Sequence, residues 1–184
     1  MASILNVDKV RATGSTTDGL TIASTGLVSQ PNLPVFRVDK TADQSGIVDN
    51  TETVITFDDV TFDPENVWDT TNNRLTVDAN TAGYWWFNTT LYVPVTTHIE
   101  TAQVYFRKNG VRQIQFFGSG RSAGGSGGPL SNTAIYNASG ILDLTSSGDY
   151  FDLTIVQNCS SGGTSNINNN GTYNRTFVQG YRLR

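Results

Sequence analysis

Large apolar side chains occupy both faces of a predicted strand between residues 83 and 93. Because side chains alternate between the two faces of a sheet, every second residue belongs to the same face. One face carries Trp85, Phe87, Leu91 and Val93, and the other carries Tyr84, Trp86 and Tyr92. The first face predicts a strand in a sandwich core. The second predicts burial against a partner subunit, since monomers seldom expose large apolar patches, with cover by the chain's own loops as the alternative.

Alternating apolar and polar positions, separated by turn residues, recur from Pro34 to the C-terminus and predict about nine strands. The expected strands are residues 35–38, 53–57, 74–77, 84–93, 102–107, 111–117, 133–144, 150–156 and 172–183. The Asn-Gly pair at 109–110 predicts a hairpin turn, because it tolerates the positive φ angles of a type I′ turn. Stretches 118–128 and 160–170, rich in Gly, Ser and Asn, predict surface loops. Such a series of strands is typical of an all-β sandwich or jelly roll.

Residues 1–33 differ from the rest, because short apolar alternations stand among Gly, Ser and Thr with few aromatic residues. Segment 18–22 is echoed by segment 25–29, but two copies are too few for a repeat solenoid. We therefore expect an N-terminal arm over residues 1–33, disordered or ordered against other chains, and one domain over residues 34–184. The residues that we expect to anchor the arm are Ile4, Leu5, Val7, Val10, Leu20 and Ile22.

Composition and charge exclude several classes of function. The chain of 184 residues suits one domain with an appendage, and its 18 glycines fit many turns. A net charge of −4, with 12 scattered Lys and Arg residues, argues against nucleic-acid binding. The single Cys159 excludes an intrachain disulfide. We expect neither secretion nor membrane insertion, because the start lacks a leader pattern and no segment is long and apolar enough to span a bilayer.

Two segments match the sequence pattern of a catalytic or cofactor-binding motif but lack the secondary structure that the motif requires. Residues 124–128 satisfy the nucleophile-elbow pattern, but Pro129 and a strand-like segment follow where that motif requires a helix. The only histidine, His98, precedes the serine, whereas that class of hydrolase needs a later one. Residues 118–123 fit a relaxed dinucleotide fingerprint that lacks its helix for the same reason. We therefore expect no enzymatic activity, no catalytic residues and no cofactor.

Metal-ligating residues are sparse as well. His98 and Cys159 supply too few ligands for zinc within one chain. Carboxylates gather at Asp58, Asp59, Asp63 and Glu65, without the spacing of a calcium loop. We expect a solvated acidic turn there and no metal site. A calcium ion on a threefold axis between subunits stays an open alternative.

A series of short sequence motifs lies along residues 34–184, in an order that is similar to that of a known domain family. Gly83, Trp85 and Phe87 form a Gly-x-aromatic-x-Phe signature, and residues 108–110 form the Lys-Asn-Gly turn that accompanies it. Further landmarks are Pro34-Val35-Phe36, Ile55-Thr56-Phe57, Trp68-Asp69, Leu75-Thr76-Val77, Leu142-Asp143-Leu144, Gly148-Asp149-Tyr150 and Val178-Gln179-Gly180-Tyr181-Arg182-Leu183. Together they resemble the globular C1q-like domain, a trimeric jelly roll that shares its shape with the tumour-necrosis-factor ligands.

The resemblance implies a C1q/TNF-like jelly-roll sandwich that forms a homotrimer. The family's core signature corresponds here to Gly83, Trp85, Phe87 and Tyr181. We assign the trimer interface to Tyr84, Trp86 and Tyr92. The chain departs from the family pattern at Val178, which replaces the usual Phe, and it lacks a collagen-like stalk. These departures argue against a role in animal complement.

The N-terminal arm is similar to the starts of tailed-bacteriophage fibre and head-decoration proteins. This likeness rests on the opening 4–10 and the Asp-Gly-Leu-Thr-Ile step at 18–22. We expect a non-enzymatic virion protein, made in the host cytoplasm, whose arm docks on a capsid or tail protein while three C1q-like heads project. The shortness of the arm favours head decoration over a tail fibre. The alternative is a fibre tip or lectin-like module that binds a bacterial surface glycan through loops 118–128 and 160–170.

Overall fold

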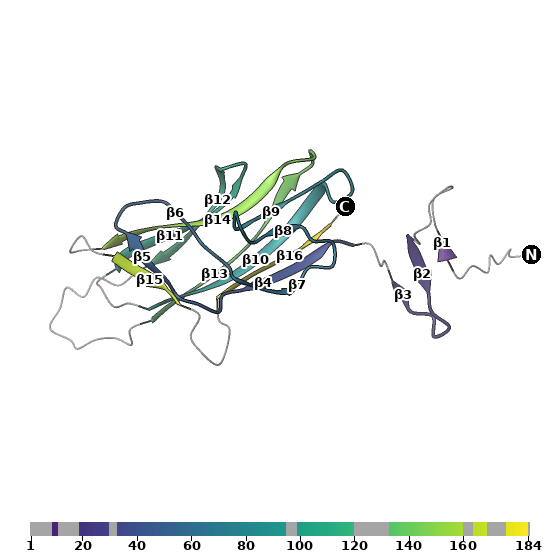
Figure 1. The fold of residues 1–184 in the computed structure, drawn as a ribbon, viewed down its shortest axis with the longest axis horizontal. Helices are drawn as coiled ribbons and strands as arrows, with labels where there is room; N and C mark the ends of the chain where they lie inside the picture. Colours follow the sequence, from purple (N-terminus) through teal and green to yellow (C-terminus); the bar gives the residue numbers. More distant parts are fainter. Residues whose placement is uncertain are drawn as a thin grey trace, which may run out of the picture. The chain divides into compact units, whose positions relative to one another are not determined.

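The computed structural model describes residues 9–10, 19–29, 33–94, 99–119, 133–159, 164–168 and 176–183. It divides the chain into two compact units, residues 1–33 and 34–184 (Figure 1). Every regular element in these described ranges is a β-strand, and they contain no helix long and apolar enough to cross a membrane. The predicted anchoring residues Ile4, Leu5 and Val7, the lone His98 and segment 120–132 lie outside the described residues.

The first unit contains a small antiparallel meander. Its strands are β1 (Lys9–Val10), β2 (Leu20–Ile22) and β3 (Val28–Ser29), paired in that order. The turn between β2 and β3 is closed by hydrogen bonds from Ala23 N to Leu27 O and from Gly26 N to Ala23 O. Gly26 has a φ of 82°, which favours glycine. The predicted arm residues Leu20 and Ile22 are half-buried, whereas Val10 is exposed.

The second unit contains two larger antiparallel sheets (Figure 1). The five-stranded sheet has the order β13 (Thr133–Leu144), β10 (Gly83–Pro94), β16 (Phe177–Arg182), β4 (Val35–Asp39) and β7 (Asp59–Phe62). The six-stranded sheet has the order β12 (Val111–Ser119), β11 (Ile99–Lys108), β14 (Tyr150–Cys159), β9 (Arg74–Thr76) and β8 (Trp68–Asp69), and β6 (Thr53–Val54) also pairs with β14. A separate ladder joins β15 (Thr164–Ile167) to β5 (Gln44–Val48).

Aromatic rings from both sheets fill the space between them. Phe87 of β10 stacks on Phe151 of β14 with 3.9 Å between ring centroids. Phe106 of β11 meets Phe151 edge-on at 5.3 Å. The predicted inward residues Trp85, Phe87, Leu91 and Val93 are all fully buried. Because these rings come from strands of different sheets, they hold the sandwich together.

The hairpin between β11 and β12 has the turn that its sequence predicts. Asn109 and Gly110 have φ angles of 51° and 75°, as a type I′ turn requires. The Asn109 side chain also ties the turn to the start of β14. Its amide donates to Asp149 Oδ1 at 2.8 Å, and its Oδ1 accepts from Tyr150 N at 2.9 Å.

Two sequence-based expectations are wrong. Tyr181 does not belong to the core: its neighbours Val178 and Gly180 point inward on β16, so alternation turns Tyr181 to the outer face. Stretch 160–170 is not wholly a surface loop, because it contains β15. Ser165 and Ile167 are fully buried there, since pairing with β5 covers the backbone that composition alone would leave in water.

Candidate interaction surface

The outer face of the five-stranded sheet carries a row of apolar side chains across four strands. On β10, Trp86 pairs with Ile141 of β13 on one side and with Tyr181 of β16 on the other. Tyr181 pairs in turn with Val35 of β4. The rings of Trp86 and Tyr181 lie 5.2 Å apart, a favourable distance for an aromatic pair. We call Ile141, Trp86, Tyr181 and Val35 the aromatic row.

Much of this row faces solvent. Ile141 is 54% exposed and Tyr181 is 39% exposed. Tyr84, two residues before Trp86 on the same strand face, is also 39% exposed. Large apolar side chains in one contiguous patch mark an interaction site more often than scattered single residues do. The aromatic row with Tyr84 is therefore the candidate interaction surface.

The predicted interface residues are not all in one place. Tyr84 and Trp86 lie together at this surface. Tyr92 is half-buried on the same strand face, about 20 Å farther along β10 at roughly 3.3 Å per residue. The polar residues Asn88 and Thr90 occupy the positions between. Ile141, Tyr181 and Val35 were missed, because cross-strand neighbours depend on a register that local sequence does not fix.

A polar network borders the aromatic row. Arg37 of β4 donates to both carboxylate oxygens of Asp39, at 2.9 and 2.8 Å. The hydrogen bond to Asp39 raises the pKa of Arg37. Thr61 also donates to Asp39, and the guanidinium of Arg37 lies 4.2 Å from the ring centre of Phe177. Both members of the pair are held in place, so this part of the face stays polar. Beyond it, Phe62 of β7, which pairs with Arg37, is 44% exposed.

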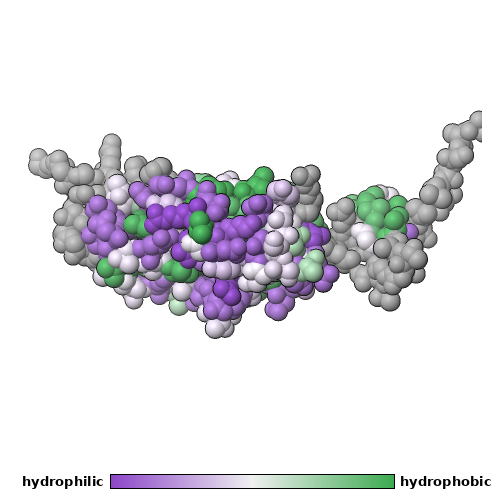
Figure 2. All heavy atoms as spheres, turned by 90° about the horizontal axis from the view of Figure 1, so that it is seen from above, coloured by the Kyte–Doolittle hydropathy of each residue, from purple (hydrophilic) through white to green (hydrophobic). Residues whose placement is uncertain are grey.

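The opposite outer face, on the six-stranded sheet, carries a charged network. Arg107 binds Asp152 through two hydrogen bonds of 2.7 and 2.6 Å. Glu52 accepts from Arg112 at 2.9 Å and from Thr154 at 2.8 Å. A sheet face satisfied in this way has little apolar area to bury. Figure 2 likewise shows one side of the molecule on which hydrophilic residues predominate, with small hydrophobic areas among them.

Two of the four clustered acidic residues, Asp58 and Asp63, accept hydrogen bonds from the backbone. Asp58 accepts from Thr41 N at 2.6 Å and from Ala42 N at 2.9 Å. Asp63 accepts from Val67 N at 3.0 Å and from Trp68 N, at the start of β8, at 2.7 Å. In the described part of the chain, no three potential ligands gather as a metal site would need. The carboxylates of Asp58 and Asp63 therefore stabilise the local backbone.

Comparison with known proteins shows the fold. No protein-family model and no curated protein matches this sequence. Among solved structures, the globular domain of zebrafish complement 1qA is similar with a TM-score of 0.51 and 13% identity, covering 82% of this chain and 98% of that one. Eiger TNF from S. frugiperda is similar with a TM-score of 0.56 and 10% identity, covering 83% and 92%. Murine APRIL is similar with a TM-score of 0.54 and 12% identity, covering 82% and 99%.

These similarities define the class of the larger unit. It is a C1q/TNF-like jelly-roll sandwich of two antiparallel sheets, which confirms the fold class that the landmark residues imply. At identities of 10–13% the likeness concerns the fold.

Proposed function

We propose that this protein is a non-enzymatic structural module that trimerises through the aromatic row and is tethered to a virion by its N-terminal unit. The observation that carries the proposal is the exposed apolar surface formed by Ile141, Trp86, Tyr181 and Tyr84. Covering it removes apolar area from water, and the opposite face, occupied by the charged network of Arg107, Asp152 and Glu52, offers less apolar area to cover. The resemblance to C1q-like domains, which are trimers, supports an assembly of three subunits.

The N-terminal unit supports the tether. Its meander has strands of only two or three residues, too short to enclose a core by themselves. Leu27 is 69% exposed and Val28 is 54% exposed. These side chains gain stability when another surface covers them, and a capsid or tail protein of the same particle is the proposed partner.

Sedimentation-velocity ultracentrifugation tests the trimer. Purified protein at micromolar concentration is expected to sediment as a species of three times 19.9 kDa. The double variant Trp86→Glu, Tyr181→Glu places two charges at the centre of the aromatic row and is expected to shift the protein to monomer. The matched control is Gln113→Glu, an exposed position on β12.

Two results would overturn the trimer. One is a wild-type monomer at micromolar concentration. The other is a double variant that keeps the circular-dichroism spectrum and the mass of the wild type. Tyr92→Glu, tested separately, reports whether the interface extends along β10 as the sequence predicts.

The glycan-binding alternative rests on two segments that the structure describes only in part. Of stretches 118–128 and 160–170, the described residues are 118–119 and 164–168. No described feature of these stretches favours a glycan, so the structural role is the function that we propose.

A further inference from the structure

A buried lysine lies directly after strand β4. Lys40 is 2% exposed, although lysine is almost never fully buried unless it is paired. Among the described residues, no carboxylate forms an ion pair with its amine. Nζ instead donates to the carbonyl oxygen of Thr56 at 2.7 Å and to Oγ1 of Thr56 at 2.9 Å. The buried amine is thus held against a single threonine.

The backbone on both sides of Thr56 is anchored. Ile55 N donates to Leu153 O at 2.9 Å, and Phe57 N donates to Asn73 Oδ1 at 2.8 Å. The side chains of Ile55 and Phe57 are buried as well, at 0% and 2% exposure. The Thr56 hydroxyl therefore has a fixed position, and its neighbours along the chain shield it from bulk water.

The carboxamide of Gln44, on β5, contacts the same threonine. Its Oε1 accepts from Thr56 N at 2.9 Å and from Thr56 Oγ1 at 3.1 Å. Its Nε2 donates to Val54 O at 2.8 Å, which fixes the other end of the group. Because a C=O bond is about 1.2 Å long, the carbonyl carbon lies no more than about 4.3 Å from Oγ1. That is within roughly 1 Å of the separation of about 3–3.5 Å from which bonds form.

These contacts bring together the parts of an acyl-transfer site. Burial, the largest cause, lowers the pKa of Lys40 despite the opposing charges of Asp58 and Asp43. A lysine amine that loses its proton more easily can act as a base toward a hydroxyl group. The N–H of the nucleophile's own residue holds the carbonyl oxygen, as one of the two oxyanion-hole donors of the serine proteases does. Base, nucleophile, carbonyl and oxyanion donor are therefore in mutual contact.

We propose that Thr56 and Gln44 join in an intramolecular ester, with Lys40 as the base. The neutral amine of Lys40 takes the hydroxyl proton, and Oγ1 of Thr56 bonds to the carbonyl carbon of Gln44. The electron pair of the C=O bond moves to Oε1, where the Thr56 N–H stabilises it. When that pair returns, the C–Nε2 bond breaks, the Lys40 ammonium gives its proton to the nitrogen, and ammonia leaves. The ester forms once per chain, without turnover.

The surroundings favour the ester once it has formed. An amide is more stable than an ester, but the released ammonia is protonated and diluted in water, which draws the exchange forward. Hydrolysis is slow where water is excluded, and Lys40, Ile55 and Phe57 are all buried. The bond closes a loop between residues 44 and 56. It therefore restricts the unfolded chain as a disulfide does.

Mass spectrometry of the denatured full chain tests this proposal. The main species of the purified protein is expected to be lighter than its sequence by one ammonia. Trypsin cleaves after Lys40 and Arg74, so both partners lie in the peptide 41–74. This peptide is expected to carry the loss and to give no backbone fragments between residues 44 and 56. Alkaline hydroxylamine opens esters and is expected to restore those fragments. Cyclisation of an asparagine also releases ammonia, but it leaves the fragments between 44 and 56 complete.

Variants assign the reaction to the three side chains. Thr56→Val removes the nucleophile and Lys40→Met removes the base, and both are expected to have the full mass of their sequences. Thr56→Ser keeps a hydroxyl and is expected to form the ester. The matched control is Thr53→Val, at a half-buried threonine of β6 whose hydroxyl donates to Thr51 O. It is expected to lose ammonia as the wild type does. Circular dichroism confirms that each variant is folded.

Three results would overturn the ester. The first is a wild-type chain that keeps the full mass of its sequence after prolonged incubation at about pH 8. The second is a loss of ammonia with complete fragments between residues 44 and 56. The third is the same loss in folded Thr56→Val. Sedimentation of the same samples reports the trimer independently, so a missing ester with an intact trimer would reject the ester alone.

Discussion

The three tryptophans occupy three different environments. Trp85 is fully buried and its indole N–H is paired within the chain. Trp86, the next residue, lies on the opposite strand face against Tyr181. Trp68 is buried between Phe36 and Phe57, with its indole N–H unpaired. These settings give one residue type two kinds of role, packing in the core for Trp85 and Trp68 and a place on the proposed interface for Trp86. Each role predicts a different response to substitution.

Phe87 is a central ring of the core between the two sheets. Its ring stacks on Phe151 and lies 6.2 Å from both Phe36 and Phe106. Phe87→Ala is expected to lower the free energy of unfolding by about 3–5 kcal/mol, measured by urea denaturation at fixed protomer concentration. Val111→Ala, at an exposed position, should stay within about 0.5 kcal/mol. A loss below about 1 kcal/mol for Phe87→Ala would mean that this ring does not join the two sheets.

Asp78 gives the stability a defined dependence on pH. Its carboxylate accepts from the Thr81 hydroxyl and from the backbone N–H groups of Asn80 and Thr81, each at 2.8 or 2.9 Å. The Thr81 hydroxyl is the largest cause of its lowered pKa. A lowered folded-state pKa stabilises the protein above the unfolded-state value of about 3.9, and this gain is lost as pH falls through the folded-state pKa.

The variant Asp78→Asn isolates that contribution. The free energy of unfolding of the wild type should fall more steeply below about pH 4 than that of the variant, because only the wild type protonates this group. Urea denaturation across the acid range measures the two slopes. Identical slopes would contradict the assigned hydrogen bonds. Asp143→Asn, at a carboxylate that is largely exposed, is the control.

At the scale of strands, the sequence predicted what depends on neighbours along the chain. The alternation around Trp85 and Trp86 assigns each residue to a face, and the Asn109-Gly110 turn sets the hairpin. The sequence could not predict the register between strands that lie far apart in the chain. Tyr181 joins Trp86 only because β16 lies beside β10, and the chain reaches that position after crossing both sheets. The alternation from Val178 already carried the signal that Tyr181 points outward.

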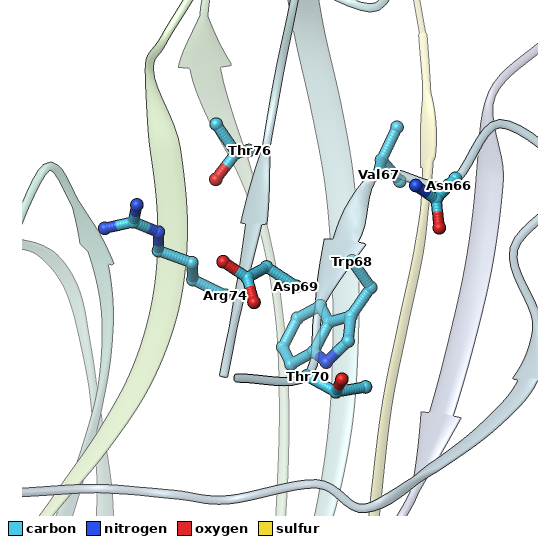
Figure 3. A pocket seen from close by; sticks show the side chains of 7 residues that line it. All are labelled: Asn66, Val67, Trp68, Asp69, Thr70, Arg74 and Thr76. Carbon is cyan, nitrogen blue, oxygen red and sulfur yellow. The ribbon is translucent and has the colours of Figure 1, made fainter. Parts of the chain in front are cut away.

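The short strands escaped prediction for a related reason. Segment 164–167 is polar and reads as a loop, yet Ser165 and Ile167 are buried through pairing with β5. Strand β8 has two residues, too few for any periodic signal. The cavity of about 440 Å³ beside it, lined by Asp69, Arg74 and Thr76 among others (Figure 3), could not be foreseen either, because it forms only where β8 pairs with β9.

Strand β16 packs closely against the core at Gly180. A methyl group at this position would lie 2.6 Å from Trp86 O and 2.9 Å from the ring of Phe36. Gly180→Ala is therefore expected to lower the free energy of unfolding by about 1–3 kcal/mol, and to weaken the trimer as β16 shifts Tyr181. Gln179→Ala, the outward neighbour, is the control. Wild-type stability and mass in Gly180→Ala would show that β16 can move without affecting the aromatic row.

At the scale of the whole molecule, the two units differ in how much buried apolar core stabilises them. The larger unit encloses a core of rings from two sheets, whereas the described residues of the smaller unit, 9–10 and 19–29, expose Leu27 and Val28 on a three-stranded meander. The larger unit is therefore expected to fold and trimerise without the smaller one. The smaller unit is expected to gain its stability from what it binds, which is the physical basis for assigning it the tether.

Removal of the N-terminal unit separates assembly from attachment. The fragment 34–184 is expected to sediment as a trimer. It is expected to be absent from purified virions, because the exposed apolar side chains of Leu27 and Val28 have been removed with the N-terminal unit. The full chain, in the same experiment, should be found on particles by immunogold electron microscopy, over the head for a decoration protein and at the tail for a fibre. The single variant Leu27→Asp tests the same contact with the meander otherwise intact. Labelling of particles by the fragment would place the attachment in the jelly roll, and absence of the full chain from every particle would reject the virion role while leaving the trimer untouched.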